Sequence, residues 1–400
     1  MKGRDLIKLF KSESNIIGLA EEVKPNESKN VQIKGLVGSL DAVVASAIYS
    51  INHQNLIFIL HEKEEAAYFH NDLQNLLGDK EVLFFPSSYK RPYEFEETEN
   101  ANILMRAEIL NRINHKASTG ELVVTYPEAL TEKVINKKSL VENTWTAKVG
   151  ESVDSDFLSE LFLTYGFVQD DFVYEPGQFS IRGGIVDIFS FGNDLPYRIE
   201  LFDEEVESIR TFDPLNQLSL KKIASVTIIP NINTQFKQEE KISFLRVLPE
   251  NTVIWIKNVQ NLLDKLQICF DKAADYADSL DVKDTSEEAK ILQERAFILP
   301  KMVMQNLVSF PIVELNKSSF FQNETVQKIG VEGKPQPSFN KNFDLLIKNF
   351  NQNTEDGIEN FLFTDNPRQI ERFYHIFEDL NAKVDFHPIN KALNQGFIDT

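Results

Sequence analysis

The feature that most constrains the fold is a regular alternation of apolar strands and helices between residues 30 and 125. Helices are expected from about Asp41 and through Phe69 to Leu77. Strands joined by helices pair in parallel, so this pattern predicts a parallel sheet with helices on its faces. The expected strands are 30–38, 55–60, 81–85 and 121–126, and an amphipathic helix before the last of them carries Ile103, Leu104, Ala107, Leu110 and Ile113.

The texture changes at about residue 128. A strand near 142–150 and a helix from Asp154 or Ser155 to Gly166 precede a β-rich block at 172–212, which predicts a small antiparallel sheet with one helix. After Pro230 strands and helices alternate again, with strands at 252–256, 361–364 and 384–386 and an Asp365-capped helix. We therefore expect an α/β fold in which a parallel-sheet domain (1–127) is interrupted by an α+β insertion (128–215) and resumed by a second α/β segment (216–400).

Charge and composition narrow the function. Among 400 residues, 61 are acidic and 42 basic, giving a net charge of −19 that disfavours a broad grip on nucleic acid and favours a protein partner. A single cysteine, Cys269, and six histidines without ligand spacing predict neither disulfides nor a metal site. With no apolar run of about 20 residues and no signal peptide, we expect a soluble, cytoplasmic, monomeric protein without membrane contact.

One segment has the position of a phosphate-binding loop but the wrong residues. It follows a strand, opens a helix and comprises Gly35, Leu36, Val37, Gly38, Ser39, Leu40, Asp41 and Ala42. A working loop needs glycine at Leu40, lysine at Asp41 to meet the β/γ-phosphates, and serine or threonine at Ala42 to hold Mg²⁺. A carboxylate at Asp41 would repel a triphosphate. We therefore expect a plain glycine turn.

The second half of the nucleotide chemistry is also missing. The strand at 252–256 ends in Lys257 and Asn258 rather than in a carboxylate pair, and Asp365 is better explained as a helix cap. The sequence thus predicts that this segment is not an enzyme and binds neither ATP nor Mg²⁺. The alternative, a divergent ATP-dependent DNA-unwinding module, would require a nucleotide site elsewhere.

The block from Glu175 to Ser219 carries the most specific pattern in the chain. It matches G-x-F-x-x-R-G-x-x-x-D-I-F followed by P-x-R-I-E-x-F-x-x-E-x-x-S-I-R-x-F-D-P-x-x-Q. This pattern resembles the insertion domain that the UvrB helicase shares with the N-terminal module of bacterial transcription-repair coupling factors (Mfd). The loop at 35–42 favours the coupling-factor version, because UvrB keeps an intact phosphate loop.

The resemblance implies a degenerate helicase-like domain, split by an insertion that recruits UvrA, the damage-recognition ATPase of nucleotide excision repair. It also implies a longer protein whose polymerase-binding domain and double-stranded-DNA translocase motor lie C-terminal to this chain. On that basis we expect an N-terminal fragment that acts as an adaptor. A third hypothesis is autoregulation, in which another part of the full-length protein covers the insertion until polymerase is engaged.

The resemblance also places the UvrA contact. Of three arginine positions used by UvrB, only Arg182 is kept, whereas Gln169 and Ser180 occupy the other two, and Val168 stands where coupling factors have an arginine. We expect the contact at Arg182, Gln169 and Val168, redistributed to Gln178, Phe179 and Ser180.

Strand alternation places Gln178, Ser180 and Arg182 on one face, expected to be solvated, and Phe179 and Ile181 on the other. Arg182 could instead pair in its own sheet with Asp187, Glu200 or Asp203, and the resemblance makes us favour partner contact. The remaining charged and aromatic residues are expected to be structural: Arg198, Arg210, Glu200 and Glu207 as a charge lattice, Gly183–Gly184 as a bulge or close-packing site, and Tyr89, Tyr93 and Phe95 as a packed acidic loop rather than a DNA wedge.

Overall fold

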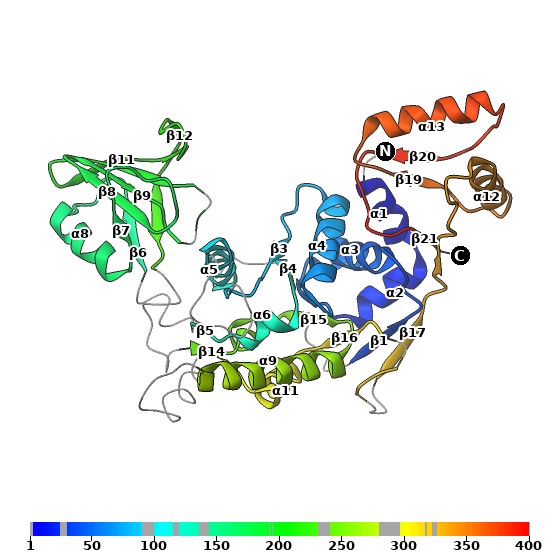
Figure 1. The fold of residues 1–400 in the computed structure, drawn as a ribbon, viewed down its shortest axis with the longest axis horizontal. Coiled ribbons are helices and arrows are strands. Elements are labelled where there is room, and N and C mark those ends of the chain that lie inside the picture. The colour runs from blue at the N-terminus through cyan, green and yellow to red at the C-terminus, as the bar shows by residue number, and fades with distance from the viewer. Residues whose placement is uncertain are drawn as a thin grey trace.

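The computed structural model describes residues 3–24, 30–89, 100–114, 120–135, 144–191, 193, 195–230, 241–279, 297–316, 318–321 and 326–399. Its centre is a seven-stranded sheet in the order β17-β1-β16-β15-β2-β4-β3, in which every pairing is parallel (Figure 1). The strands are β1 (Val31–Lys34), β2 (Asn55–Ile59), β3 (Leu83–Phe84), β4 (Leu122–Thr125), β15 (Thr252–Ile256), β16 (Ile312–Glu314) and β17 (Gln327–Gly330).

Strands from before and after the insertion interleave in this sheet. β15 and β16 lie between β1 and β2, so β1 has no direct neighbour from its own part of the chain. The sheet is therefore complete only when the chain has returned from the insertion. The predicted α/β fold, a parallel-sheet domain interrupted by a small α+β domain, is confirmed.

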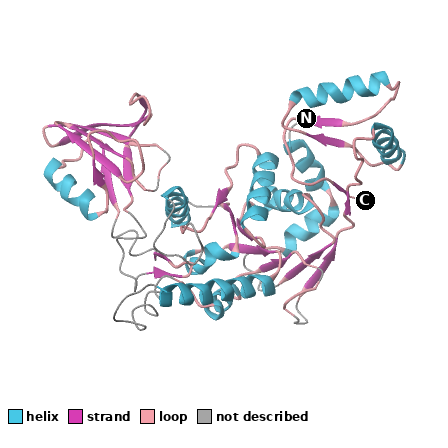
Figure 2. Ribbon diagram, viewed as in Figure 1, coloured by secondary structure: helices cyan, strands magenta, loops and turns pink. Residues whose placement is uncertain are grey.

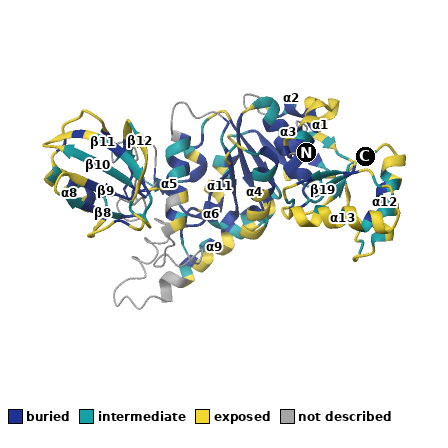
Figure 3. Cartoon of the chain, turned by 90° about the horizontal axis from the view of Figure 1, so that it is seen from above, coloured by how far each residue is buried: buried dark blue, intermediate teal, exposed yellow. Residues whose placement is uncertain are grey.

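Helices cover both faces of the sheet. α3 (Leu40–Asn52) is buried along most of its length and ends at His53, which adopts a left-handed conformation (Figure 3). The other helices of this domain are α1 (Gly3–Ser12), α2 (Ser14–Glu22), α4 (Lys63–Leu77), α5 (Asn100–Asn114), α6 (Pro127–Thr131), α9 (Val259–Ser279) and α11 (Pro300–Leu307). In the part of the chain that the structure describes, no helix is long and apolar enough to cross a membrane.

The insertion is a separate, strand-rich body (Figure 2). The short strands β5 (Val134–Ile135) and β14 (Lys241–Ile242), which precede and follow it in the sequence, pair with each other. Its sheet has the order β12-β11-β10-β9-β8-β7, antiparallel except between β7 and β8. The strands are β7 (Val168–Gln169), β8 (Gln178–Arg182), β9 (Ile185–Ile188), β10 (Tyr197–Phe202), β11 (Glu205–Phe212) and β12 (Ser219–Ile223).

One face of this sheet is covered by α8 (Ser155–Thr164). This is the predicted helix, and Asp154 is its N-cap. Phe162 of α8 packs edge-on against Phe179, and β6 (Trp145–Lys148) pairs with β13 (Ser225–Ile228) to close the same core. The boundary expected at residue 215 is therefore wrong. β12 and β13 belong to the insertion because they hydrogen-bond to β11 and β6.

A smaller unit follows the central sheet. It contains α12 (Phe343–Glu355), β19 (Phe361–Phe363), α13 (Pro367–Asp379) and β20 (His387–Ile389), with β19 and β20 parallel. Two local predictions need correction here. Asn366, not Asp365, caps α13, and the strand lies just after residues 384–386, because residues 387–389 are the ones that pair with β19.

Candidate functional site

The loop at 35–42 is neutralised from within the chain. The Nζ atom of Lys257, at the end of β15, lies 2.5 Å from Oδ2 of Asp41 and 3.7 Å from Oε1 of Glu65. Burial alone would lower the pKa of Lys257, but the Asp41 and Glu65 carboxylates raise it above its ordinary value. The acid in the loop and the base at the strand end, both unexpected for a nucleotide site, therefore pair with each other.

The mouth of the loop is filled by the segment after β20. The Ser39 hydroxyl donates to Oδ2 of Asp72 at 2.5 Å and accepts from the N–H of Gln395 at 3.0 Å. The Ser39 N–H donates to the Gln395 carbonyl, and the Asn394 N–H donates to Asp72. A Cβ atom at Gly38 would lie 2.7 Å from the carbonyl oxygen of Gly396, so the backbone of this segment packs directly on the loop.

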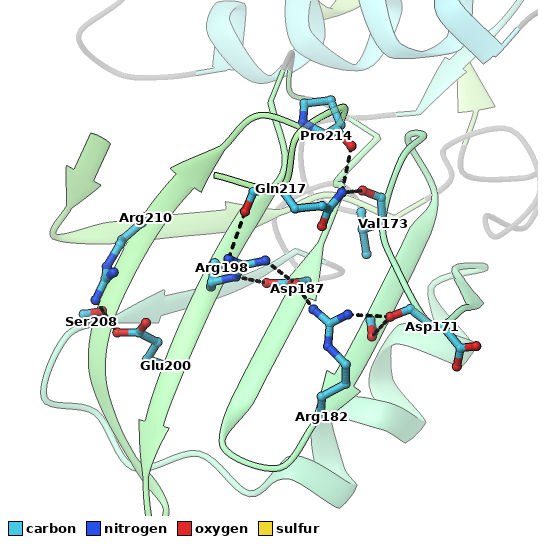
Figure 4. A network of polar contacts seen from close by, with 11 residues as sticks. Asp171, Val173, Arg182, Asp187, Arg198, Glu200, Ser208, Arg210, Pro214 and Gln217 are labelled. Carbon is cyan, nitrogen blue, oxygen red and sulfur yellow. Dashed lines mark hydrogen bonds and ion pairs between the residues drawn. The ribbon is translucent and has the colours of Figure 1, made fainter. Parts of the chain in front are cut away.

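A second charged network lies on the face of the insertion sheet opposite α8, which the loop at Asp171 partly covers (Figure 4). Asp187 of β9 is fully buried and accepts from two arginines. Its Oδ1 is 2.7 Å from Nε of Arg198, and its Oδ2 is 2.8 Å from Nη2 of Arg198 and 2.6 Å from Nη2 of Arg182. Hydrogen bonding to Asp187 raises the pKa of Arg198. One carboxylate thus serves two guanidinium groups, and one positive charge is left over.

Aromatic rings and backbone carbonyls fix both arginines in place. The guanidinium of Arg182 lies 4.7 Å from the ring centre of Phe172 and donates to the carbonyl of Asp171. The guanidinium of Arg198 lies 4.7 Å from the ring centre of Phe212 and donates to the carbonyl of Gln217. Such contacts orient a cation without neutralising it, so the excess charge is held in a defined position.

The register of the strands continues this series of charged residues from β9 across β10 and β11 to β12. Asp187 lies opposite Arg198, Arg198 opposite Arg210, and Arg210 opposite Lys222. Directly opposed residues share one face of a sheet. We call this surface the arginine face, formed by Arg182, Asp187, Arg198, Glu200, Arg210 and Lys222. It carries four cations and two carboxylates, and Glu200 pairs with Arg210.

The predicted UvrA-contact residues fall into two groups. Val168 and Gln169 are exposed, Gln178 is half-buried, and the Arg182 side chain is 36% exposed. Phe179 and Ser180 are buried, so their expected availability to a partner is wrong. Phe179 belongs to the core against α8, and Ser180 does not project into solvent because its hydroxyl donates to the Asp171 carbonyl of the loop that covers it.

The pairing of Arg182 with Asp187, the less favoured of the two interpretations of Arg182, is present in the structure. It leaves partner contact open, because the shared carboxylate does not cancel both arginines. Sequence reasoning missed Arg198, which was assigned to a lattice with glutamates. The motif itself held a signal, since its residues Arg182, Asp187 and Arg198 meet in this network and its Glu200 and Arg210 pair beside it on the same face.

Two other sequence features have plainer explanations. Gly183, with a φ of 60°, forms the turn between β8 and β9, and a Cβ atom at Gly184 would lie 2.6 Å from the Leu201 carbonyl, as expected for close packing. Tyr89 packs beside Phe297, with ring centres 5.7 Å apart. Tyr93 and Phe95 lie outside the described residues.

These features describe a class of protein in which a small antiparallel insertion domain interrupts a parallel α/β domain. The family model described as the UvrB interaction domain matches residues 146–233. This range includes β12 and β13, in agreement with the strand pairings rather than with a boundary at residue 215.

Among the matching relatives are proteins named transcription-repair-coupling factor. That of Bacillus subtilis (strain 168) is 30% identical over 262 residues, covering 64% of this chain and 22% of the relative. Those of Borreliella burgdorferi and Staphylococcus epidermidis are 23% and 26% identical over 72% and 77% of this chain, and 23% and 24% of the relatives. The predicted resemblance to the N-terminal UvrB-homology module of coupling factors is confirmed, and the chain spans less than a quarter of each relative.

Proposed function

We propose that this chain is a non-catalytic adaptor module that recruits UvrA to RNA polymerase stalled at a lesion, in transcription-coupled nucleotide excision repair. The similarity to coupling factors and the UvrB interaction domain support this role. In this proposal, regions outside this chain contact RNA polymerase and double-stranded DNA. They also carry the ATP-dependent translocase activity of the family.

The observation that carries the proposal is the sharing of buried Asp187 by Arg182 and Arg198. The surplus positive charge is held rigid on a sheet face of a protein whose net charge is −19. An oriented guanidinium suits a carboxylate on a partner, and arginine is enriched among residues that dominate binding energy. Arg182, the more exposed of the two arginines, is therefore the proposed anchor.

Calorimetry of the whole chain with its cognate UvrA tests the proposal. Arg182→Ala is expected to weaken binding by about tenfold or more, as for an anchor residue, and Arg182→Lys by less, because it keeps the charge but loses the fork. Arg372→Ala, at an exposed arginine of α13, is the matched control and should bind like wild type. Absence of wild-type binding would overturn the adaptor role, whereas equal binding by Arg182→Ala would overturn only the anchor assignment.

We further propose that the loop at 35–42 is structural and holds neither ATP nor Mg²⁺. Lys257 already pairs with Asp41, and the Ser39 N–H that a phosphate would use donates to Gln395. Titration with millimolar Mg²⁺–ATP should give no saturable signal. Binding or hydrolysis that disappears in a Lys257→Met variant, which lacks the cation beside the loop, would revive the alternative, an ATP-dependent unwinding module.

A further inference from the structure

An apolar and basic edge lies beside the arginine face, at the end of the insertion sheet. β12 is a terminal strand in the sheet order, so among the described residues one side of its backbone has no strand partner. Three leucines in and before this strand are exposed: Leu215 by 87%, Leu218 by 65% and Leu220 by 59%. We call this surface the leucine edge, formed by Leu215, Leu218, Leu220, Lys221 and Lys222.

The two lysines of the leucine edge are exposed. Within the described residues, neither Lys221 nor Lys222 forms an ion pair. The nearest register partners of these lysines on β11 are Thr211 and Arg210, which offer no negative charge. In a chain with 61 acidic residues, two adjacent unpaired cations beside three exposed leucines are a local departure from the average surface.

The turn that leads into β12 is rigid. The Asp213 N–H donates to the Leu218 carbonyl, the Gln217 N–H donates to the Asp213 carbonyl, and Oδ1 of Asp213 accepts from the Leu215 N–H. The Gln217 amide group donates to the carbonyls of Val173 and Pro214 (Figure 4). Leu215 and Leu218 are thus presented by a backbone that is already ordered, which lowers the entropy lost on binding.

We propose that the leucine edge binds an extended acidic peptide segment, which adds to the sheet as a further strand beside β12. Its backbone would pair with the free side of β12. Its carboxylates would meet Lys222 on the arginine face and Lys221 on the opposite face, because adjacent residues of a strand point to opposite faces. Its apolar residues would cover Leu218 and Leu220. Strand addition of this kind takes its affinity from main-chain hydrogen bonds and its specificity from alternate side chains. The occupant is chosen by charge complementarity with Lys221 and Lys222, whose register partners on β11 carry no negative charge.

The probe is a short synthetic peptide that alternates pairs of glutamates with pairs of isoleucines, so that each face of the strand carries both. It is titrated against the whole chain by fluorescence anisotropy. Lys221→Glu/Lys222→Glu should weaken binding by about tenfold or more at low salt, because attraction becomes repulsion. Leu218→Ser/Leu220→Ser should weaken it by about tenfold through lost apolar burial. The matched control, Lys348→Glu/Lys383→Glu, changes two exposed lysines of the C-terminal unit and should leave binding unchanged.

A peptide N-methylated at alternate amides distinguishes strand pairing from mere charge attraction. It keeps every side chain but should lose binding, while hydrogen exchange should show protection of β12 amides by the unmodified peptide only. Arg182→Ala should leave peptide affinity unchanged, which separates this site from the proposed UvrA contact. Equal binding by the methylated peptide, by a lysine-for-glutamate peptide or by the Lys221/Lys222 variant would overturn the proposal.

Two further outcomes would also overturn it. No binding of the glutamate peptide by folded protein would mean that the lysines only guard the edge against aggregation. Dimerisation of the wild type in sedimentation, abolished by Leu218→Ser/Leu220→Ser, would identify a second copy of the chain as the occupant.

Discussion

The loop at 35–42 and the arginine face both gather charges at strand ends or faces, yet they balance them differently. At the loop, Lys257 is shared by two carboxylates and the mouth is filled by residues 394–396. On the arginine face, one carboxylate is shared by two arginines, and Arg182 remains partly exposed. A site whose groups are covered and paired internally has little left for a ligand, whereas an open face with surplus charge can bind one.

The largest effect is expected where a buried carboxylate holds the arginine face together. Asp187→Asn would leave Arg182 and Arg198 without their counter-charge, which should lower the free energy of unfolding by about 3–5 kcal/mol. Chemical denaturation followed by a probe in the insertion measures it. Asp203→Asn, in an exposed turn of the same domain, is the control and should change little. An unchanged midpoint for Asp187→Asn would show that the arginines do not depend on this carboxylate.

Removing the cation that pairs with the loop at 35–42 should also lower the free energy of unfolding, but by a smaller amount. Lys257→Met leaves Asp41 buried without a partner and should lower the free energy of unfolding by about 3 kcal/mol. Adding Asp41→Leu should restore much of that loss, so a double-mutant cycle gives the coupling. The control Lys265→Met removes a more exposed lysine, 3.9 Å from Glu128, and should cost less than about 1 kcal/mol. Additive effects would contradict the internal neutralisation of the loop.

Asp72 gives the contact between the loop and residues 394–395 a pH dependence. Burial raises the pKa of Asp72 from its ordinary value of 3.8 to about 6. The folded protein therefore binds more protons at this group than the unfolded chain between about pH 4 and 6, so its contribution lowers stability as pH rises through that window. The loss should reach about 2 kcal/mol.

The variant Asp72→Asn removes this titration while keeping an acceptor for the Asn394 N–H. Between pH 4 and pH 7, the contribution of Asp72 lowers the free energy of unfolding of the wild type by about 2 kcal/mol. The Asp72→Asn variant should lack this decrease. Asp379→Asn, at an exposed residue of α13, should behave like wild type. Parallel pH profiles for Asp72→Asn and wild type would exclude Asp72 as the titrating group.

The smallest effect is expected at the neutral pair of the arginine face. Glu200 and Arg210 are each about a quarter exposed, and such pairs contribute little. Glu200→Gln should change the free energy of unfolding by only about 0.5 kcal/mol. It should strengthen UvrA binding slightly if the net positive charge matters, which calorimetry can check. A loss comparable to that of Asp187→Asn would remove the distinction between the two carboxylates.

Much of this architecture follows from the sequence alone. Period-two and helical patterns located most of the strands and helices, because burial of one face imposes a period that the chain itself displays. The motif at 175–219 identified the insertion, and Asp41 with Lys257 led to the prediction, still to be tested, that the loop holds no nucleotide. These are properties of individual residues and of their spacing.

Only the tertiary structure decided which of these residues meet. Asp41 and Lys257 are 216 positions apart, and Ser39 and Gln395 are 356 apart, so no local pattern could pair them. Alternation assigned Ser180 to the correct side of β8, but the loop at Asp171 covers it, and β12 extends the sheet beyond the expected boundary. Spacing along a strand fixes the direction of a side chain, whereas its partners and exposure depend on segments that the fold brings from elsewhere.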